Sequence, residues 1–382
     1  MYPSFVESID SVTAVDWDVL AGNTNPFLRH AFLSTLETTG CVTPKTGWFP
    51  QHLLLHSEGV GRGRLIGAVP MYLKSHSYGE YVFDWAWANA YEHAGLRYYP
   101  KLVVGIPFTP VTGPRLLIAP DTEQGTIKRH LIRAVLDRAK AAQVSSLHWL
   151  FLPSEDMAPL AEAGHMHRTG YQFHWHNQGY DSFDQFLAEF ASAKRKKIKQ
   201  ERRYVREAGV SIELLRGEDI KTHHWDTFYQ FYLSTLHNYR AIPYLNRSFF
   251  HKLGALMAED VLLIFARQND EYIAGALNLL GADVLYGRYW GHRKYVNGLH
   301  FEACYYAAMG YCIEQRLKRF EAGAQGEHKI ARGFLPETTY SAHWLSHPEF
   351  GPAVADFLER EQHSVKYYMD ELQEHSPFKK SV

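Results

Sequence analysis

The sequence repeats one order of predicted elements in its two halves. In the first half, apolar patterning predicts strands over residues 51–57, 64–73 and 81–87, a helix over 122–142 and a closing strand over 146–152. In the second half, it predicts strands over 261–267, 272–280 and 284–290, a helix over 300–316 and a strand that begins at 319–322. The chain has 382 residues, which is long enough for two hydrophobic cores. The repeat therefore predicts a duplicated α/β fold with mostly antiparallel strands.

We expect a first domain over residues 1–170 and a second over 171–382. The second would include a basic helix over 192–208, because residues 194–206 form a dense run of positive charge. Basic residues along a helix attract phosphates, so this helix is a candidate contact for RNA. The alternative is a solvated amphipathic helix whose sparse apolar side carries Ile198 and Tyr204. Helical patterns also extend over 225–238 and 350–374.

The composition is that of a globular protein, with 46% hydrophobic and 21% charged residues. A net charge of −1 gives no global reason to bind DNA. Aromatic residues make up 14%, which suits a groove with flat side chains and equally suits a tyrosine-rich core. The three cysteines have no metal-ligand spacing, and Cys304 and Cys312 fall in an apolar helical stretch, so we expect buried thiols and no metal site. Without a signal segment or a long apolar window, a cytoplasmic protein with no membrane span is expected.

Several segments resemble the FemAB-like N-acyltransferases, which are also described as peptidoglycan biosynthesis and recognition proteins. Residues 321–336 carry the resemblance, with the sequence Glu-Ala-Gly-Ala-Gln-Gly-Glu-His-Lys-Ile-Ala-Arg-Gly-Phe-Leu-Pro. Further matching segments lie at residues 46–48, 84–99, 99–102, 107–115, 195–203, 243–245 and 341–344. This family resembles the FemABX aminoacyltransferases, which have two GNAT-like halves. Those enzymes move an amino acid from aminoacyl-tRNA to an amine of a cell-wall precursor.

The resemblance implies an N-acyltransferase with no tightly bound cofactor. Its acyl donor would be a co-substrate, either aminoacyl-tRNA or acyl-CoA, and its acceptor a small-molecule or peptide amine. CoA-binding GNAT enzymes carry a glycine-rich loop before the helix of the second half, and here Gly298 alone lies in that region. This departure counts against a standard CoA site. Two alternatives stay open: an acetyl-CoA-dependent GNAT N-acetyltransferase of a small amine, and a non-catalytic module that recognises a cell-wall precursor. The oligomeric state stays open as well.

The candidate catalytic residues lie just after the predicted strand at 319–322. Acyl transfer to an amine passes through an oxyanion, which needs a cation or an amide donor already in place. The resemblance implies that role for Lys329 or Arg332. The amine proton needs an acceptor, which Glu327 or His328 could supply.

The candidate substrate-binding residues fall in two groups. In the first half an aromatic stretch could line an acceptor groove, with a carboxylate that anchors a cation, although a packed aromatic core would give the same pattern. In the second half the end of a central strand should border the acyl group. The residues proposed on these grounds are Asp84, Trp85, Glu92, His93 and Lys101, and Arg288, Tyr289, Trp290, His292 and Gly326.

Overall fold

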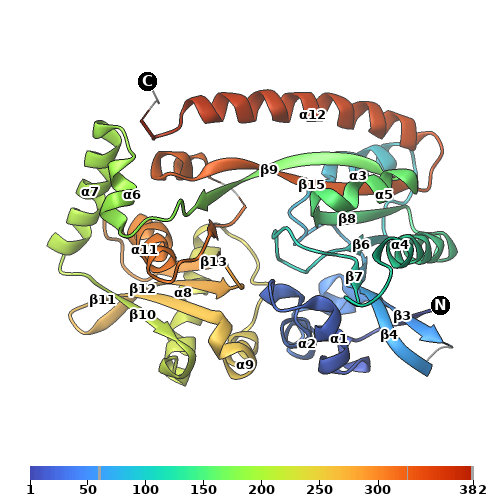
Figure 1. Ribbon diagram of the computed structural model, residues 1–382, viewed down its shortest axis with the longest axis horizontal. Coiled ribbons are helices and arrows are strands. Elements are labelled where there is room, and N and C mark those ends of the chain that lie inside the picture. The colour runs from blue at the N-terminus through green and yellow to red at the C-terminus, as the bar shows by residue number, and fades with distance from the viewer. Residues whose placement is uncertain (59–61, 325, 380–382) are drawn as a thin grey trace. The chain divides into compact units, whose positions relative to one another are not determined.

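The computed structural model describes residues 1–58, 62–324 and 326–379 (Figure 1). Gln325, which belongs to the 321–336 stretch, lies outside the described residues. Contacts within the chain divide it into two compact units: unit 1 holds Met1–Tyr171 and Thr338–Tyr368, and unit 2 holds Gln172–Glu337 and Met369–Val382. The sequence-based boundary at residue 170 keeps residues 338–368 in the second domain, whereas their contacts are with unit 1. They belong there because the last strand of the chain pairs with a strand of the first half.

Unit 1 contains two groups of strands. The first is a sheet of order β1-β3-β4-β7, with β1 Tyr2–Val6, β3 His52–Glu58, β4 Arg62–Val69 and β7 Leu117–Ile118. The second follows the order β15-β8-β6-β5-β2, with β2 Trp48–Pro50, β5 Met71–Lys74, β6 Lys101–Val104, β8 Ser146–Leu152 and β15 Leu335–Leu345. The strand predicted over 64–73 is divided between the two groups at Pro70, which has no backbone N–H for a ladder bond.

The helices of unit 1 are α1 Ala14–Ala21, α2 His30–Thr38, α3 Trp85–His93, α4 Gln124–Ala141, α5 Met157–Glu162 and α12 Phe350–Glu374, whose last residues belong to unit 2. Helix α4 buries Leu131 and Val135 in the main core against the strands. The strand predicted over 81–87 is wrong, because α3 begins at Trp85. Trp87 and Tyr91 are one helical turn apart and pack together against α12, and this packing favours a helix.

Unit 2 is built on strands in the order β10-β11-β12-β13-β14-β9. Their bounds are β9 Met166–His176, β10 Ser211–Arg216, β11 Val261–Gln268, β12 Glu271–Leu280, β13 Val284–His292 and β14 Arg319–Glu321. The helices are α6 Phe183–Ala188, α7 Ser192–Glu207, α8 Thr222–Asn238, α9 Arg247–Met257, α10 Leu299–Phe301 and α11 Ala307–Glu314, with a π-helical turn at Glu302–Tyr306 between the last two. Helix α8 packs on β12 and β13, and α10–α11 lie on the opposite face of these strands (Figure 1).

Both units contain a strand, a helix and a second strand that returns parallel to the first. In unit 1 these are β6, α4 and β8, and in unit 2 they are β13, α10–α11 and β14. The neighbouring pairs β5–β6 and β12–β13 are antiparallel. This arrangement confirms the predicted mixed α/β fold with mostly antiparallel strands. Among the described residues, no helix is both long and apolar enough to span a membrane.

Candidate active site

The candidate site of unit 2 lies where two parallel strands separate. Strands β13 and β14 pair from Val284, opposite Arg319, to Tyr286, opposite Glu321. Strand β14 then ends, while β13 continues to His292. A cavity of about 100 Å³ opens beyond this point, here called the small cavity. Its lining consists of Ala276, Leu277, Asn278, Gly287, Arg288, Tyr289, Trp290, His300, Cys304, Tyr305 and Ala322. Three of the residues predicted to border the acyl group, Arg288, Tyr289 and Trp290, therefore line this cavity.

Two backbone irregularities meet at the small cavity. The register of β12 against β13 shifts between Leu277 and Asn278, whose partners are Tyr289 and Gly287, so Arg288 is an extra residue in a β-bulge. The π-helical turn Glu302–Tyr306 carries two further lining residues. A bulge frees backbone groups from the ladder, and π-turns occur frequently at functional sites.

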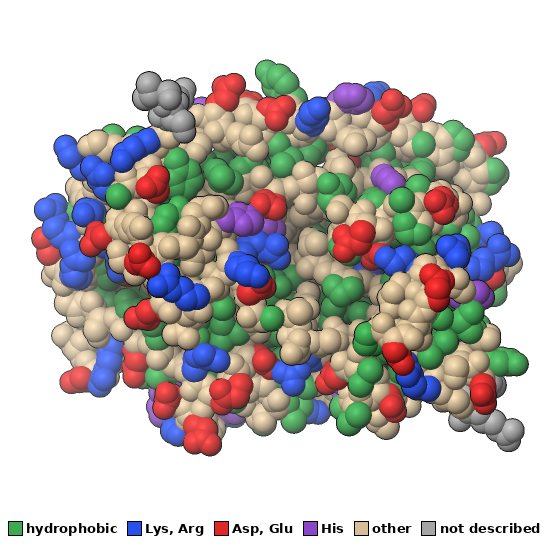
Figure 2. All heavy atoms as spheres, in the orientation of Figure 1, with side chains coloured by type: hydrophobic (Ala, Val, Ile, Leu, Met, Phe, Trp, Pro, Cys, Tyr) green, Lys and Arg blue, Asp and Glu red, His purple; other side chains and the backbone are tan. Residues whose placement is uncertain are grey.

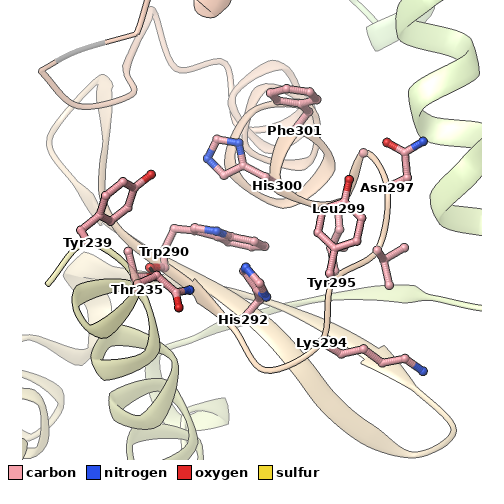
Figure 3. A pocket seen from close by; sticks show the side chains of 13 residues that line it. Thr235, Tyr239, Trp290, His292, Lys294, Tyr295, Asn297, Leu299, His300 and Phe301 are labelled. Atoms are coloured by element: carbon pink, nitrogen blue, oxygen red, sulfur yellow. Dashed lines mark hydrogen bonds between the residues drawn. The ribbon is translucent and has the colours of Figure 1, made fainter.

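Figure 3 shows the lining of a second cavity, here called the large cavity, which adjoins the small one and measures about 350 Å³. Trp290 and His300 line both. The other lining residues are Thr235, Asn238, Tyr239, His292, Lys294, Tyr295, Val296, Asn297, Gly298, Leu299 and Phe301. Figure 3 shows Tyr239 and Tyr295 on opposite sides of the space, with the Trp290 ring between them. Among the described residues, this lining contains no carboxylate. Burial, reinforced by the neighbouring His328, lowers the pKa of His300 to about 4, so its ring is neutral at pH 7.

Lys329 lies behind the wall of the small cavity. Its Nζ donates to the carbonyl oxygen of Gly323 (2.8 Å), the residue after the lining residue Ala322. The side chain is buried, and its charge acts on both Cys304 and His300. Burial lowers the pKa of Lys329 to about 7, so this ammonium gives up its proton far more readily than an exposed lysine does.

Arg332 clamps the loop that contains Lys329 onto helix α7. Its Nη2 donates to Oε1 of Glu201 (2.8 Å) and its Nη1 to the carbonyl oxygen of His328 (2.7 Å). The guanidinium lies 3.3 Å from the ring centroid of Phe301. Glu201, a buried carboxylate within the basic helix, also accepts from the Tyr306 hydroxyl. These contacts hold Arg332 outside the lining of the small cavity, where Arg288 is a lining cation and Lys329 lies behind the wall.

His328 and Tyr305 link the small cavity to solvent. His328 Nε2 and the Tyr305 hydroxyl lie 2.9 Å apart in a hydrogen bond, Tyr305 lines the cavity, and His328 is exposed. Partial burial, followed by the charges of Arg332 and Lys329, lowers the pKa of His328, which favours a neutral ring. Gly326 lies beside this imidazole with φ +117°, and a Cβ there would come within 2.6 Å of the ring. Glu327 is exposed at the start of the same turn.

The residues proposed from the first half separate into two environments. Lys101 is fully buried and donates to Ser77 (2.8 Å), Glu80 (2.8 Å) and Asp84. Burial alone would raise the pKa of Asp84, but Lys101, together with His148 and Ser77, outweighs it and holds the pKa at about 2. These charges neutralise one another inside unit 1. Trp85, Glu92 and His93 are instead exposed on α3.

Unit 1 is filled at the point that corresponds to the small cavity. Strands β6 and β8 pair in parallel as far as Val104, which lies opposite Trp149 and ends β6. The chain then returns along β8: Gly113 N donates to Phe151 O (3.1 Å), and Arg115 Nε donates to Leu150 O (3.0 Å). The guanidinium of Arg115 is fully buried and also donates to the carbonyl oxygens of residues 111, 113 and 114.

Helix α7 exposes most of its basic residues. Exposed members are Lys194, Lys196, Lys197, Lys199, Arg203 and Arg206. Arg202 is instead paired with Glu302, with Nη2 and Oε1 2.9 Å apart. Lys and Arg side chains gather over α7 at the left edge of the view in Figure 2.

Comparison with known proteins identifies the family. The model of the FemAB-like family, described as peptidoglycan biosynthesis/recognition, matches residues 8–380. The chain belongs to the FemAB-like family. This membership confirms the resemblance found in residues 321–336, and it makes the protein an acyltransferase by family. A search of the curated proteins found no match.

Solved structures share the fold of this FemAB-like chain. FemX is 12% identical, with a TM-score of 0.56, and the match covers 93% of this chain and 100% of FemX. L-PGS from Bacillus licheniformis is 10% identical, with a TM-score of 0.51 and coverage of 89% and 98%. At such identities the likeness shows the fold, and the site must be argued from its own residues.

Proposed function

We propose that this FemAB-like acyltransferase moves an aminoacyl group from the 3′ end of an aminoacyl-tRNA to an amine of a peptidoglycan precursor. The observation that carries the proposal is the pair of adjoining cavities where β13 and β14 separate. The small cavity would hold the aminoacyl group. The large cavity would hold the part of the donor to which that group is attached.

The shape of the large cavity favours a nucleoside ester over a CoA thioester. In an aminoacyl-tRNA the ribose and the flat adenine directly follow the acyl group, whereas in acyl-CoA a thin flexible chain follows it. A wide space lined by Trp290, Tyr239 and Tyr295 suits a base, because bases stack on aromatic side chains. The glycine at position 298 is explained by packing and does not require a pyrophosphate-binding loop. A Cβ there would lie 2.8 Å from the backbone oxygen of Glu201 on α7.

The basic helix supports an RNA donor. Helix α7 packs against α10, whose residues line the large cavity, so its exposed cations lie on an element next to that site. Lysine and arginine side chains bind backbone phosphates without regard to base sequence. The clamp between Glu201 and Arg332 joins this helix to the loop of Lys329.

The chemistry follows from the side chains around the small cavity. The acceptor amine attacks the ester carbonyl, a C–N bond forms, and the C–O bond to the ribose oxygen breaks. In this proposal the Lys329 ammonium turns from the Gly323 carbonyl into the small cavity and stabilises the oxyanion. It then gives its proton to the leaving oxygen, for which a pKa of about 7 is suitable. The amine proton passes to Tyr305 as that hydroxyl gives its own proton to His328. Both groups are restored by exchange with solvent.

The donor is tested by RNA binding with matched variants. In the α7 variant, Lys196, Lys197 and Arg203 are replaced by Ala, because Arg202 is needed for its internal ion pair. The control replaces three exposed cations of α4 by Ala: Arg129, Arg133 and Lys140. We expect the α7 variant alone to bind aminoacylated tRNA more weakly, with a salt slope shallower by roughly 2 to 3, since about three phosphate contacts are lost.

The same experiment has a clear contrary outcome. If the parent does not bind RNA, if both variants bind it equally, or if CoA rather than RNA raises the melting temperature, the RNA donor is wrong. The CoA result would favour the acetyl-CoA-dependent alternative. Tight binding of a precursor without turnover of any donor would favour the recognition module.

A further inference from the structure

Glu321 ends strand β14 next to the point where β13 and β14 separate. The residue after it, Ala322, lines the small cavity, and so does Gly287, which follows its register partner Tyr286. The Glu321 side chain is 4% exposed, and it takes no part in the transfer steps assigned to other residues. A buried carboxylate is costly unless it is fully paired or has a functional role, so Glu321 needs an explanation.

Glu321 belongs to a polar cluster on one face of its sheet. Phe320 lies against Gly287, where a Cβ would come within 3.2 Å of the phenyl ring, and side chains alternate along a strand. Glu321 therefore points to the face opposite Phe320. Strand β14 pairs with β9, and directly opposite residues share a face. The polar cluster on this face consists of Arg319, Glu321, His174, His176 and Glu337.

The contacts of the polar cluster leave one oxygen of Glu321 unused. Arg319 Nη2 lies 2.8 Å from Oε1, whereas Oε2 has no hydrogen-bond partner among the described residues, and His174 Nε2 is 3.8 Å from it. At the other end of the cluster, His176 and Glu337 form a hydrogen bond of 2.5 Å, and each is more than a third exposed. The polar cluster thus extends from a buried carboxylate oxygen to solvent.

The charges around Glu321 balance its two protonation states. They belong to Arg319 on its own strand, Arg288 and Tyr286 on β13, His174 on β9 and Glu337 on β15. Burial raises the pKa of Glu321 to about 7, although the Arg319 guanidinium lowers it. His174 is neutral, because burial lowers its pKa to about 3. Near neutral pH, Glu321 can therefore either hold a proton or accept one.

We propose that Glu321 receives the ammonium group of the acceptor and takes from it the proton that must leave before the nitrogen attacks. The acceptor then belongs to the primary alkyl amines, which are protonated at neutral pH. The inference rests on the proposed function, because it assigns a residue to the acceptor of that transfer. In the described residues β13 and β14 are unpaired beyond Tyr286 and Glu321, and this is where an amine at the polar cluster reaches the acyl group.

Two protons leave the acceptor nitrogen in this transfer. The first passes from R–NH₃⁺ to the Glu321 carboxylate, which leaves a neutral amine with a free lone pair. The second passes to Tyr305 after the C–N bond has formed. Arg319 and Arg288 favour the first step, because nearby positive charges lower the pKa of an ammonium. Glu321 regains its negative charge by proton exchange with solvent at the exposed end of the polar cluster.

The test compares two acceptors that differ in protonation. The donor is tRNA charged in vitro with radiolabelled amino acids. The acceptors are Nα-acetyl-L-lysine methylamide, whose side-chain amine is protonated at pH 7, and hydroxylamine, which is largely neutral there. Glu321→Gln should slow catalysed transfer to the lysine amine by about 10²-fold to 10⁴-fold, the usual effect of losing a base, and leave transfer to hydroxylamine nearly unchanged.

The matched control is Glu213→Gln on β10. It removes a partly buried carboxylate of the same unit, which accepts a hydrogen bond from Tyr272 (2.7 Å). Because β10 lies at the far end of the strand order from β14, this variant should change neither rate.

A second readout uses the parent protein alone, so it does not depend on how the variants fold. If Glu321 takes the proton of a bound ammonium, kcat/KM for the lysine amine should rise through pH 7 and level off above about pH 8. If the enzyme uses only amine that is already neutral in solution, kcat/KM should keep rising about tenfold per pH unit toward the pKa of the amine, about 10.4.

The outcomes separate the two levels of the argument. If the parent transfers to neither acceptor, the proposed function is wrong, and the inference falls with it. If the parent transfers to both, the role of Glu321 is overturned by a variant that slows both reactions equally or neither, and equally by a parent profile that never levels off. In those cases the transfer function stands.

Discussion

Replacement of Lys329 by Met should make the protein more stable and much less active. In the native protein this ammonium is buried, and it donates to the carbonyl oxygen of Gly323 without a carboxylate partner among its described hydrogen bonds. Its pKa falls from 10.5 to about 7, which corresponds to a free-energy penalty of roughly 5 kcal/mol for the fully charged form. A functional site commonly carries such a cost, because the same desolvated cation stabilises an oxyanion strongly.

The sign of the pH dependence follows from proton binding in the two states. Between pH 7 and 10.5 the unfolded chain holds the Lys329 proton and the folded chain has released it, so the stability of the parent rises with pH in that window. Methionine cannot bind this proton. At pH 7 the variant should gain roughly 3 kcal/mol, after about 1 kcal/mol is deducted for the lost hydrogen bond. This advantage should nearly vanish at pH 9.5.

The measurement is urea-induced unfolding of both proteins at pH 7 and pH 9.5, together with the transfer rate at pH 7. The control is Lys199→Met on α7, an exposed lysine that should shift stability by less than about 0.5 kcal/mol at either pH. Loss of the oxyanion donor should reduce the rate by about 10²-fold to 10³-fold. A variant less stable than the parent at pH 7, or a difference that does not shrink with pH, would refute the account of Lys329.

Three further outcomes are expected. Glu201→Gln should destabilise the protein by about 3–5 kcal/mol in urea unfolding, because it leaves the buried Arg332 without its anionic partner; a loss below about 1 kcal/mol would contradict the clamp. His328→Ala should lower the maximal transfer rate and remove the limb of the pH profile below 6.5; an unchanged limb would exclude His328 as the proton acceptor. Arg115→Ala should lower the unfolding midpoint while the affinity for aminoacylated tRNA stays unchanged, and a weakened affinity would show that unit 1 acts in donor binding.

The sequence predicted the elements whose periodicity extends over many residues. The helices of residues 122–142 and 300–316, the strands of the second half and the basic helix all lie close to their predicted positions. The short aromatic stretch at 81–87 was ambiguous, because aromatic residues favour strands while the contact of Trp87 and Tyr91 with α12 depends on residues far along the chain. Tertiary packing therefore decided between helix and strand.

The candidate site could be predicted in part. The crowding of charges after residue 323 indicated the loop that lies behind the small cavity, but it gave no reason to distinguish Lys329 from Arg332. The distinction depends on Glu201, which is 131 residues from Arg332 in sequence and belongs to a helix otherwise rich in positive charge. The available signal was that Glu201 is the one acidic residue within the basic run of residues 194–206. The bulge at Arg288 and the π-turn at Cys304 each amount to one residue of shifted register, which periodicity does not resolve.

The two units follow one plan and differ at the point where chemistry becomes possible. In each unit, two parallel strands are joined by a helix, and one of the two strands extends past the end of their pairing. This is β8 in unit 1 and β13 in unit 2. In unit 1 the free edge of β8 is taken by residues 111–115, and the buried Arg115 satisfies carbonyl groups that would otherwise lack donors. In unit 2 the corresponding space stays open because Ala276, Gly287 and Ala322 are small. Residues 111–115 are themselves held by several hydrogen bonds, so their displacement by a substrate would cost considerable free energy. This difference supports our placement of the proposed transfer site in unit 2, the unit that also carries Lys329.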